Sequence, residues 1–138
     1  MKVTARVTYA FLALLELALN QNQVRIQARE IALRQHIPLR FLEQIMIQLK
    51  KAGLVRSTRG ATGGYTLHRS PAQITLRNIV EAVEGEVSFV DPKLNPGPAI
   101  SKVWNEIEVE FVEKLESITV QDVVHRKLQE DQVIVYHI

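Results

Sequence analysis

The chain has 138 residues, of which 46% are hydrophobic, and a formal net charge of +2; this composition suits one packed domain and excludes a disordered chain. The absence of cysteine excludes disulfides, thiolate catalysis and thiolate-ligated clusters. No apolar run reaches the ~18 residues of a membrane span. The apolar stretch 10–19 is interrupted by Glu16 and lacks a signal-peptide cleavage site, so we expect a cytoplasmic protein with no membrane partner.

Charge is distributed unevenly along the chain. Residues 1–80 hold 12 Lys or Arg and 3 acidic residues, a net charge of +9, whereas residues 81–138 hold 5 and 12, a net charge of −7, and the two halves sum to +2. A basic half beside an acidic half indicates one surface for a polyanion and a second surface with another role. An unevenly charged solvated surface would give the same counts, so charge alone leaves both interpretations open.

Three helices are predicted in close succession in the first half. Thr4 can cap a helix that ends near residue 19, and after a polar turn a short helix follows over about 27–35. Pro38 suits the start of a third helix over about 39–52, which Gly53 can close in a left-handed C-cap. The second and third helices have helix-turn-helix spacing. The predicted buried face of the third consists of Leu42, Ile45, Met46 and Leu49.

A basic hairpin is predicted directly after the third helix. Residues 55–59 and 65–68 have the composition of short strands, and the connection 60–64 contains three glycines, which permit the positive φ angles of a tight hairpin. The glycine run is not a nucleotide-binding loop, because no Lys-Ser/Thr pair follows it. A recognition helix followed by such a wing is the layout of a winged helix-turn-helix. The expected fold class is therefore mainly α with a small β wing.

The second half continues with helices and a loop. Thr75 can cap a short helix that Gly85 ends, and the segment 91–98 is predicted to be a loop because it contains three prolines. A long helix over about 99–118 follows, then a last helix from Thr119 to about residue 128 and a strand-like tail. These bounds predict three parts: a DNA-binding domain over 1–90, a Pro-rich loop over 91–98, and a dimerisation helix with a C-terminal segment over 99–138.

The long helix has one apolar stripe, with glutamates on its other sides. A helix of about 20 residues is ~30 Å long, which exceeds what a small winged domain covers. We therefore expect part of the stripe to pack on a second copy, although an intramolecular core helix would show the same periodicity. The predicted dimer interface consists of Ile100, Val103, Trp104, Ile107, Phe111 and Leu115.

Polar side chains outside the buried stripe of the third helix suit the major groove of duplex DNA, which admits one helix. Arg40 could donate two hydrogen bonds to guanine, and Gln44 could form two with adenine. Glu43 could accept from cytosine or orient Arg40 by a local ion pair. Lys50 and Lys51 lie near the helix end, where phosphate contacts are expected.

Two further sites complete the predicted DNA surface. Arg59 at the wing tip suits a narrow minor groove, and Arg6 with the N-terminus of the first helix suits a phosphate. A lone exposed Lys or Arg is, however, often only solvated. The full predicted set is Thr4, Arg6, Arg40, Phe41, Glu43, Gln44, Gln48, Lys50, Lys51, Arg59, Gly60, Gly63, Gly64 and Tyr65.

Residues for catalysis or metal binding are not grouped in the sequence. The four histidines, at 36, 68, 125 and 137, include no helical i, i+4 pair, and no serine, histidine and carboxylate grouping indicates a nucleophile. His36 is predicted to be a turn residue. We therefore expect no metal, no cofactor and no enzymatic activity.

Several segments together resemble the Rrf2 family of winged helix-turn-helix transcriptional regulators, which includes IscR, CymR and NsrR. They are Thr4-Ala5-Arg6, the helix 42–45, the helix end 49–55, the wing 59–65 and the helix 79–85. The resemblance covers nearly the whole chain. It implies a homodimer with crossed long helices on an imperfect palindrome of double-stranded DNA. It also implies base and phosphate contacts at the positions of Arg40, Glu43, Gln44 and Arg59.

One departure from the family bears on its cofactor. Many relatives carry three cysteines before the long helix and bind an iron–sulfur cluster there, whereas this chain has none, and histidine with carboxylates substitutes poorly for soft thiolates. We therefore predict a cluster-free regulator and expect a repressor in preference to an activator. Alternatives are a winged-helix module that docks a protein, a sensor that responds through a regulatory protein partner or a non-cysteine ligand, and a metal- or cluster-dependent sensor or enzyme. The operator, the regulated genes and the signal do not follow from the sequence.

Overall fold

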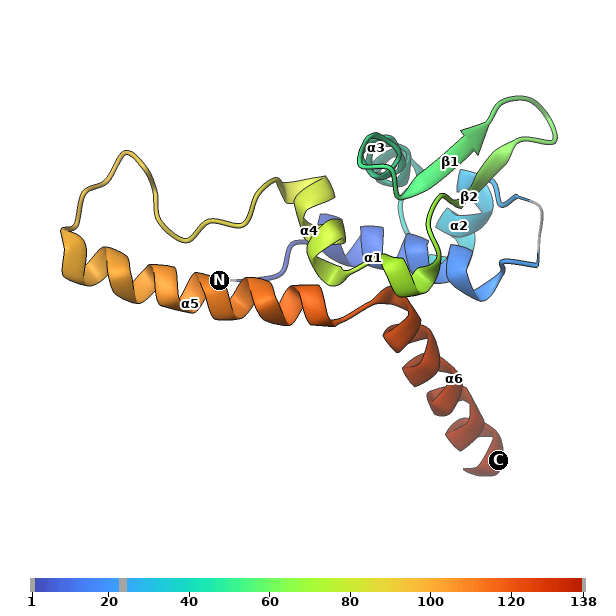
Figure 1. Cartoon of the computed structure of the whole chain (residues 1–138). Coiled ribbons are helices and arrows are strands. Elements are labelled where there is room, and N and C mark those ends of the chain that lie inside the picture. Colours follow the sequence, from blue (N-terminus) through green and yellow to red (C-terminus); the bar gives the residue numbers. More distant parts are fainter. Residues whose placement is uncertain (1, 23–24, 138) are drawn as a thin grey trace.

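The computed structural model describes residues 2–22 and 25–137, in which most helices pack around the first one and one hairpin lies at the edge (Figure 1). None of the helices in this described part combines the length and hydropathy of a membrane span. The predicted fold class, mainly α with a small β wing, is confirmed. The elements in chain order are α1 (Ala5–Leu19), α2 (Ala28–Gln35), α3 (Leu39–Lys51), β1 (Val55–Thr58), β2 (Gly64–Leu67), the 3-10 turn η1 (Pro71–Gln73), α4 (Leu76–Glu84), α5 (Pro98–Ser117) and α6 (Val120–His137).

Side chains and glycines cap the helices at the positions that the sequence predicts. The Thr4 hydroxyl accepts a hydrogen bond from the Val7 amide at 3.3 Å and caps α1. At the end of α3, Gly53 has a φ of 75°, which a left-handed C-cap requires. The Leu54 amide then donates to the carbonyl of Leu49 at 3.0 Å. Thr75 caps α4 in a capping box with Asn78.

A tight turn joins α2 to α3. His36 adopts the left-handed conformation, with a φ of 55°, which confirms its predicted place in a turn. The amide of the next residue, Ile37, donates to the Ala32 carbonyl at 2.9 Å, and the Ile37 side chain is buried. This turn fixes α3 across α2 in a helix-turn-helix, so the outer face of α3 is free for another molecule.

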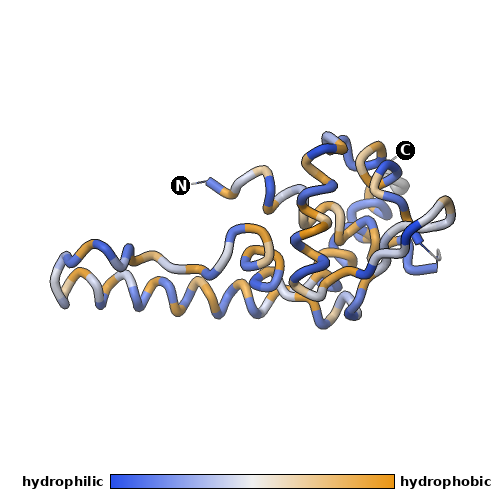
Figure 2. The backbone as a smooth tube through the Cα atoms, turned by 90° about the horizontal axis from the view of Figure 1, so that it is seen from above, coloured by the Kyte–Doolittle hydropathy of each residue, from blue (hydrophilic) through white to orange (hydrophobic). Residues whose placement is uncertain are grey.

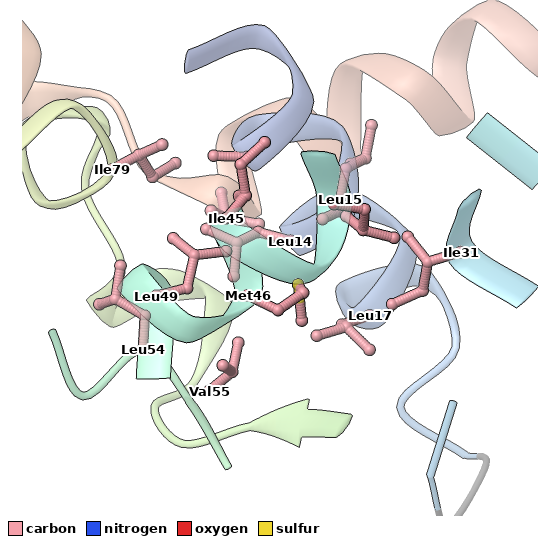
Figure 3. Packing of buried hydrophobic residues seen from close by; sticks show 14 of the residues in the cluster. Leu14, Leu15, Leu17, Ile31, Ile45, Met46, Leu49, Leu54, Val55 and Ile79 are labelled. Atoms are coloured by element: carbon pink, nitrogen blue, oxygen red, sulfur yellow. The ribbon is translucent and has the colours of Figure 1, made fainter. Parts of the chain in front are cut away.

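The hydrophobic core lies where α1, α3 and α4 meet (Figure 3). Leu14 of α1 packs there with Ile79 of α4. The predicted buried face of α3 is confirmed, because all four of its members are at most 1% exposed: Leu42, Ile45, Met46 and Leu49. The core therefore orients α3 by one face and leaves the opposite face in solvent.

The wing is a two-stranded antiparallel hairpin, with Val55 opposite Leu67 and Thr58 opposite Gly64. Residues 25–27, the described part of the connector directly before α2, add a third segment beside it. Ile26 pairs with Tyr65 through two backbone hydrogen bonds of 3.0 and 2.8 Å. No local pattern in the sequence predicts this pairing.

The loop 85–97 leads away from the end of α4, and helix α5 runs back beside it, so the two form an arm that extends from the body (Figures 1 and 2). The chain returns to the body where it left. The Leu76 amide donates to the Ile118 carbonyl at 2.8 Å, and the Val120 amide donates to the Ile74 carbonyl at 2.9 Å. The start of α6 is consequently part of the core.

The last helix is longer than predicted. It continues through His137 instead of ending near residue 128, so the tail that looks strand-like in sequence belongs to this helix. β-branched residues favour strands only weakly, and adding residues to a helix that already exists is easier than forming a new element.

Candidate nucleic-acid interface

The outer face of α3 presents the side chains predicted to meet bases. Arg40, Glu43 and Gln44 are all exposed, in the first half of the helix. Arg40, Gln44 and Lys51 recur at intervals of four and seven residues, which places them on one side of the helix, opposite the buried stripe. Phe41 is 52% exposed beside them. The structure therefore brings a mixed donor and acceptor surface together on a single convex helix.

Two hydrogen bonds hold the flanks of α3. On one flank, Nη2 of Arg6 donates to Oε1 of Gln48 at 2.5 Å and joins the first turn of α1 to the recognition helix. On the other, Nζ of Lys50 donates to Oγ of Ser57 at 2.6 Å and joins the helix to the wing. Arg6 and Lys50 thus keep positive charge at the two margins of the helix in fixed positions.

The wing tip depends on its glycines. Gly60 has a φ of 105°, which favours glycine over other residues. At Gly63, an added Cβ would lie 2.1 Å from the Thr58 carbonyl oxygen, so a side chain there is excluded. These positions shape the tip, and Arg59 is exposed at its start.

Tyr65 and Glu43 link the wing electrostatically to the recognition helix. Burial raises the pKa of the Tyr65 phenol, and the negative charge of Glu43 raises this pKa further. The phenol therefore stays protonated at neutral pH and remains a hydrogen-bond donor. Within the described residues, Glu43 forms no ion pair with Arg40.

The hydroxyl of Thr4 is used for hydrogen bonds within the protein. Besides capping α1, its hydroxyl donates to Oε1 of Glu84 at 2.6 Å, which connects α1 to the end of α4. Its proton is therefore engaged inside the protein. Among the predicted DNA residues, Thr4 differs from Arg40 or Gln44, whose polar atoms face solvent.

A buried carboxylate with no role predicted from the sequence supports the helix-turn-helix. Glu16 of α1 is only 7% exposed. Its Oε1 accepts from Nη1 of Arg34 at 2.9 Å and from Asn20 at 3.1 Å, and its Oε2 accepts from Gln35 at 2.7 Å. The hydrogen bond from Arg34 is the main reason that the pKa of this guanidinium is raised. A charged residue inside the apolar run 10–19 was the available signal for such a partner.

The residues present do not fit an iron–sulfur cluster. The sequence contains no cysteine, and in the described part of the chain no three His, Asp or Glu side chains gather as metal ligands. Cluster irons are held chiefly by thiolates. The segment before α5 therefore lacks the donor set that such a cofactor requires.

A helix-turn-helix with an exposed third helix, a basic wing and fixed cationic flanks defines a winged helix-turn-helix DNA-binding protein. A family model described as Rrf2, iron-dependent transcriptional regulator, matches residues 3–126. The chain belongs to the Rrf2 family, and it is a DNA-binding transcriptional regulator and not an enzyme.

Individual relatives agree with this placement. The chain is 31% identical to the HTH-type transcriptional regulator CymR of Bacillus subtilis over 138 residues, which cover 100% of both chains. The solved structure of CymR, described as the global cysteine regulator of B. subtilis, superposes with a TM-score of 0.79 at 32% identity and covers 91% of this chain and 98% of that one. The structure of T. potens IscR superposes with a TM-score of 0.77 at 33% identity, covering 92% and 88% of the two chains.

Proposed function

We propose that the protein is a cytoplasmic, homodimeric repressor that binds a palindromic operator without an iron–sulfur cluster. The observation that carries this proposal is the pairing of an exposed recognition helix with an exposed apolar stripe on α5. One surface reads DNA, and the other recruits the second copy that a palindrome requires.

The DNA contacts follow from the arrangement of α3 and the wing. Arg40 and Gln44 lie where base edges would meet the helix, and each good bidentate contact discriminates by about 1–3 kcal/mol. Arg6, Lys50 and Lys51 would neutralise phosphates on either side. Arg59 would enter the adjacent minor groove, where negative potential is concentrated.

Dimerisation is supported by apolar surface that the single chain leaves uncovered. Five of the six predicted interface residues are 42–54% exposed on α5: Ile100, Val103, Trp104, Ile107 and Phe111. The sixth, Leu115, is 7% exposed and already packed within the chain, so it would add little area to an interface. Contiguous exposed apolar surface of this kind marks a protein contact.

An apolar groove near the base of the arm supports the same arrangement. It has a volume of about 560 Å³ and lies between α1, α4 and α5, with Val7, Phe11, Leu12 and Val80 among its lining residues. Phe111 and Leu115 of the stripe also line this groove, so stripe and groove form one continuous apolar surface that two copies could cover symmetrically.

Repression and the absence of a cluster complete the proposal. An operator-bound dimer that overlaps a promoter blocks polymerase without further contacts, so occupancy alone accounts for repression. The segment before α5 has no thiolates to hold an iron–sulfur cluster, which argues for a signal other than loss of such a cluster.

The test is to capture fragmented genomic DNA with the purified protein and sequence what is retained. A recurrent two-fold symmetric motif is expected, and the double variant Arg40→Ala/Gln44→Ala should lose it. Retention of DNA without any motif would contradict operator binding. Repression is then checked with a reporter gene placed behind the motif, since increased expression would show activation instead.

Dimerisation is tested separately by sedimentation. Ile107→Glu places a charge in the stripe and should yield monomers. Lys102→Glu, an exposed substitution on the other side of the same helix, should leave the dimer intact. A wild-type chain that sediments as a monomer would contradict the proposed assembly.

A further inference from the structure

We propose that Arg25 and Gln27, in the connector between α1 and α2, are positioning residues that brace the wing tip and so hold Arg59 ready for DNA. This inference rests on the proposed function for the DNA role of Arg59. The brace itself consists of contacts within the chain.

Both side chains reach the wing tip directly. Nη1 of Arg25 donates to the carbonyl oxygen of Thr62 at 3.1 Å, and Nε2 of Gln27 donates to the carbonyl oxygen of Ala61 at 3.1 Å. The two acceptors are consecutive residues of the exposed tip. The connector therefore fixes the backbone of the loop that begins next to Arg59.

The connector is itself anchored by the residue between them. In an extended segment, alternate side chains point to opposite sides. Ile26 is 2% exposed and in the hydrophobic core, whereas Arg25 and Gln27 are exposed. The two donors thus extend from a backbone whose central residue cannot move without disturbing the core.

Close backbone contact continues the brace below the tip. Ile26 exchanges two backbone hydrogen bonds with Tyr65. At Gly64, an added Cβ would lie 2.8 Å from the carbonyl carbon and oxygen of Ile26, so only glycine lets the strands approach this closely. The wing is consequently joined to the connector at three successive levels, through Tyr65, Ala61 and Thr62.

The wing needs such support because it is small. Each of its strands has four residues, and an isolated two-stranded hairpin is only marginally stable in water. A tip that is ordered before binding avoids the entropy of ordering it on the DNA. Loss of one brace contact is therefore expected to weaken DNA binding about three- to tenfold.

A double-mutant cycle separates bracing from direct contact. The probe is a duplex that wild-type protein selects from a random pool, and Kd is measured for Gln27→Met, Arg59→Ala and the double variant. Methionine keeps the length of glutamine and removes the donor without adding charge. Because Gln27 acts through Arg59, the double variant should bind nearly as Arg59→Ala alone does.

Two results would overturn the inference. One is a double variant whose loss equals the product of the two single losses, which would mean that Gln27 acts independently of Arg59. The other is a Gln27→Met variant that binds like wild type. Gln21→Met, an exposed substitution in the α1–α2 turn, is the matched control and should bind unchanged.

Amide hydrogen exchange in the free protein tests the brace without DNA. The Gly63 amide donates to the Gly60 carbonyl at 3.0 Å, and its exchange should accelerate in Gln27→Met while amides of α3 keep their protection. Unchanged exchange at the tip would overturn the brace. If Arg59→Ala binds like wild type, the DNA role of the wing fails, and the exchange result alone decides whether the brace exists.

Discussion

Nη2 of Arg6 lies 2.5 Å from Oε1 of Gln48, so the first turn of α1 determines how a recognition-helix side chain is presented. A guanidinium only donates hydrogen bonds, and the oxygen of the Gln48 amide must therefore face it. The amide nitrogen is left for an acceptor on another molecule. Arg6 has further donors free for a phosphate.

We expect Arg6→Ala to weaken binding to all duplexes by a similar factor, because phosphate contacts carry no base information. The slope of log Kd against log salt concentration should decrease by about 1. Titrations at several salt concentrations measure this slope. Arg126→Ala, an exposed substitution on α6, is the control and should change neither quantity. A loss confined to one base position would contradict the phosphate role.

Gln44→Ala should instead relax specificity. Its amide is exposed on the outer face of α3, and loss of a bidentate base contact costs about 1–3 kcal/mol at one base pair of each half-site. Selection from a randomised operator compares base preferences of variant and wild type. The same substitution at the exposed Gln129 of α6 should leave the preferences intact. Equal losses on every sequence would argue against base readout by Gln44.

Gly63→Ala should open the wing tip. An added Cβ would lie 2.1 Å from the Thr58 carbonyl oxygen and 2.9 Å from that of Gly60, so the hairpin must shift. We expect a loss of about 1–3 kcal/mol in stability, as for other local strain, and DNA affinity near that of Arg59→Ala. Thermal unfolding and binding titrations measure both. Thr62→Ala, at an exposed tip position, keeps the backbone acceptor and should resemble wild type.

Glu16→Ala should destabilise the helix-turn-helix. It removes a buried carboxylate that accepts hydrogen bonds from Asn20, Arg34 and Gln35, at a cost of about 2–4 kcal/mol. Glu30 also pairs with Arg34, at 3.4 Å, but it is exposed. Glu30→Ala should therefore cost no more than about 0.5 kcal/mol. Equal effects in urea unfolding would show that the buried carboxylate has no special role.

The start of α6 should respond to acid through Asp122. The Thr119 amide donates to Oδ2 of Asp122 at 2.8 Å, and the Asp122 amide donates to the Thr119 hydroxyl at 3.2 Å. Hydrogen bonding to the carboxylate from the backbone amide of Thr119, and from its side chain, holds the pKa of Asp122 below its ordinary value of 3.8. The resulting stability is present above the unfolded-state pKa and is lost as pH falls through the lower folded-state pKa.

Asp122→Asn should consequently lower Tm at pH 7, and the difference from wild type should shrink at pH 3. Thermal scans at both pH values measure it. Asp131→Asn affects only an exposed i, i+4 pair with Lys127 and should shift Tm little at either pH. A Tm difference between wild type and Asp122→Asn that is as large at pH 3 as at pH 7 would contradict the capping role.

Local signals account for the predictions that hold. The buried stripe of α3 follows from helical periodicity. Thr4 and Thr75 cap the start of a helix and Gly53 closes the end of one, each by contacts with near neighbours in the chain. Such contacts join residues that are close in the sequence, and they can therefore be predicted before any tertiary structure is known.

The features that were missed depend on distant partners. Tyr65 pairs with Ile26 and Glu16 binds Arg34 across many residues, and neither partner is specified by local pattern. The same holds for Lys50, whose bond to Ser57 depends on how the wing folds back. The expected end of α6 near residue 128 was wrong for another reason. The β-branched composition of the tail favours a strand only weakly, and continuation of the existing helix outweighed it.

Backbone hydrogen bonds join residues 74–76 to residues 118–120. The segment made of α4, the loop after it and α5 therefore begins and ends at the same place on the body. Most of the loop 85–97 is exposed, and it lies between two helix ends. Its length and chemistry are thus free to change over evolutionary time while α3 and the wing keep their geometry. A change in this loop can therefore leave the DNA-binding half of the chain in its present geometry.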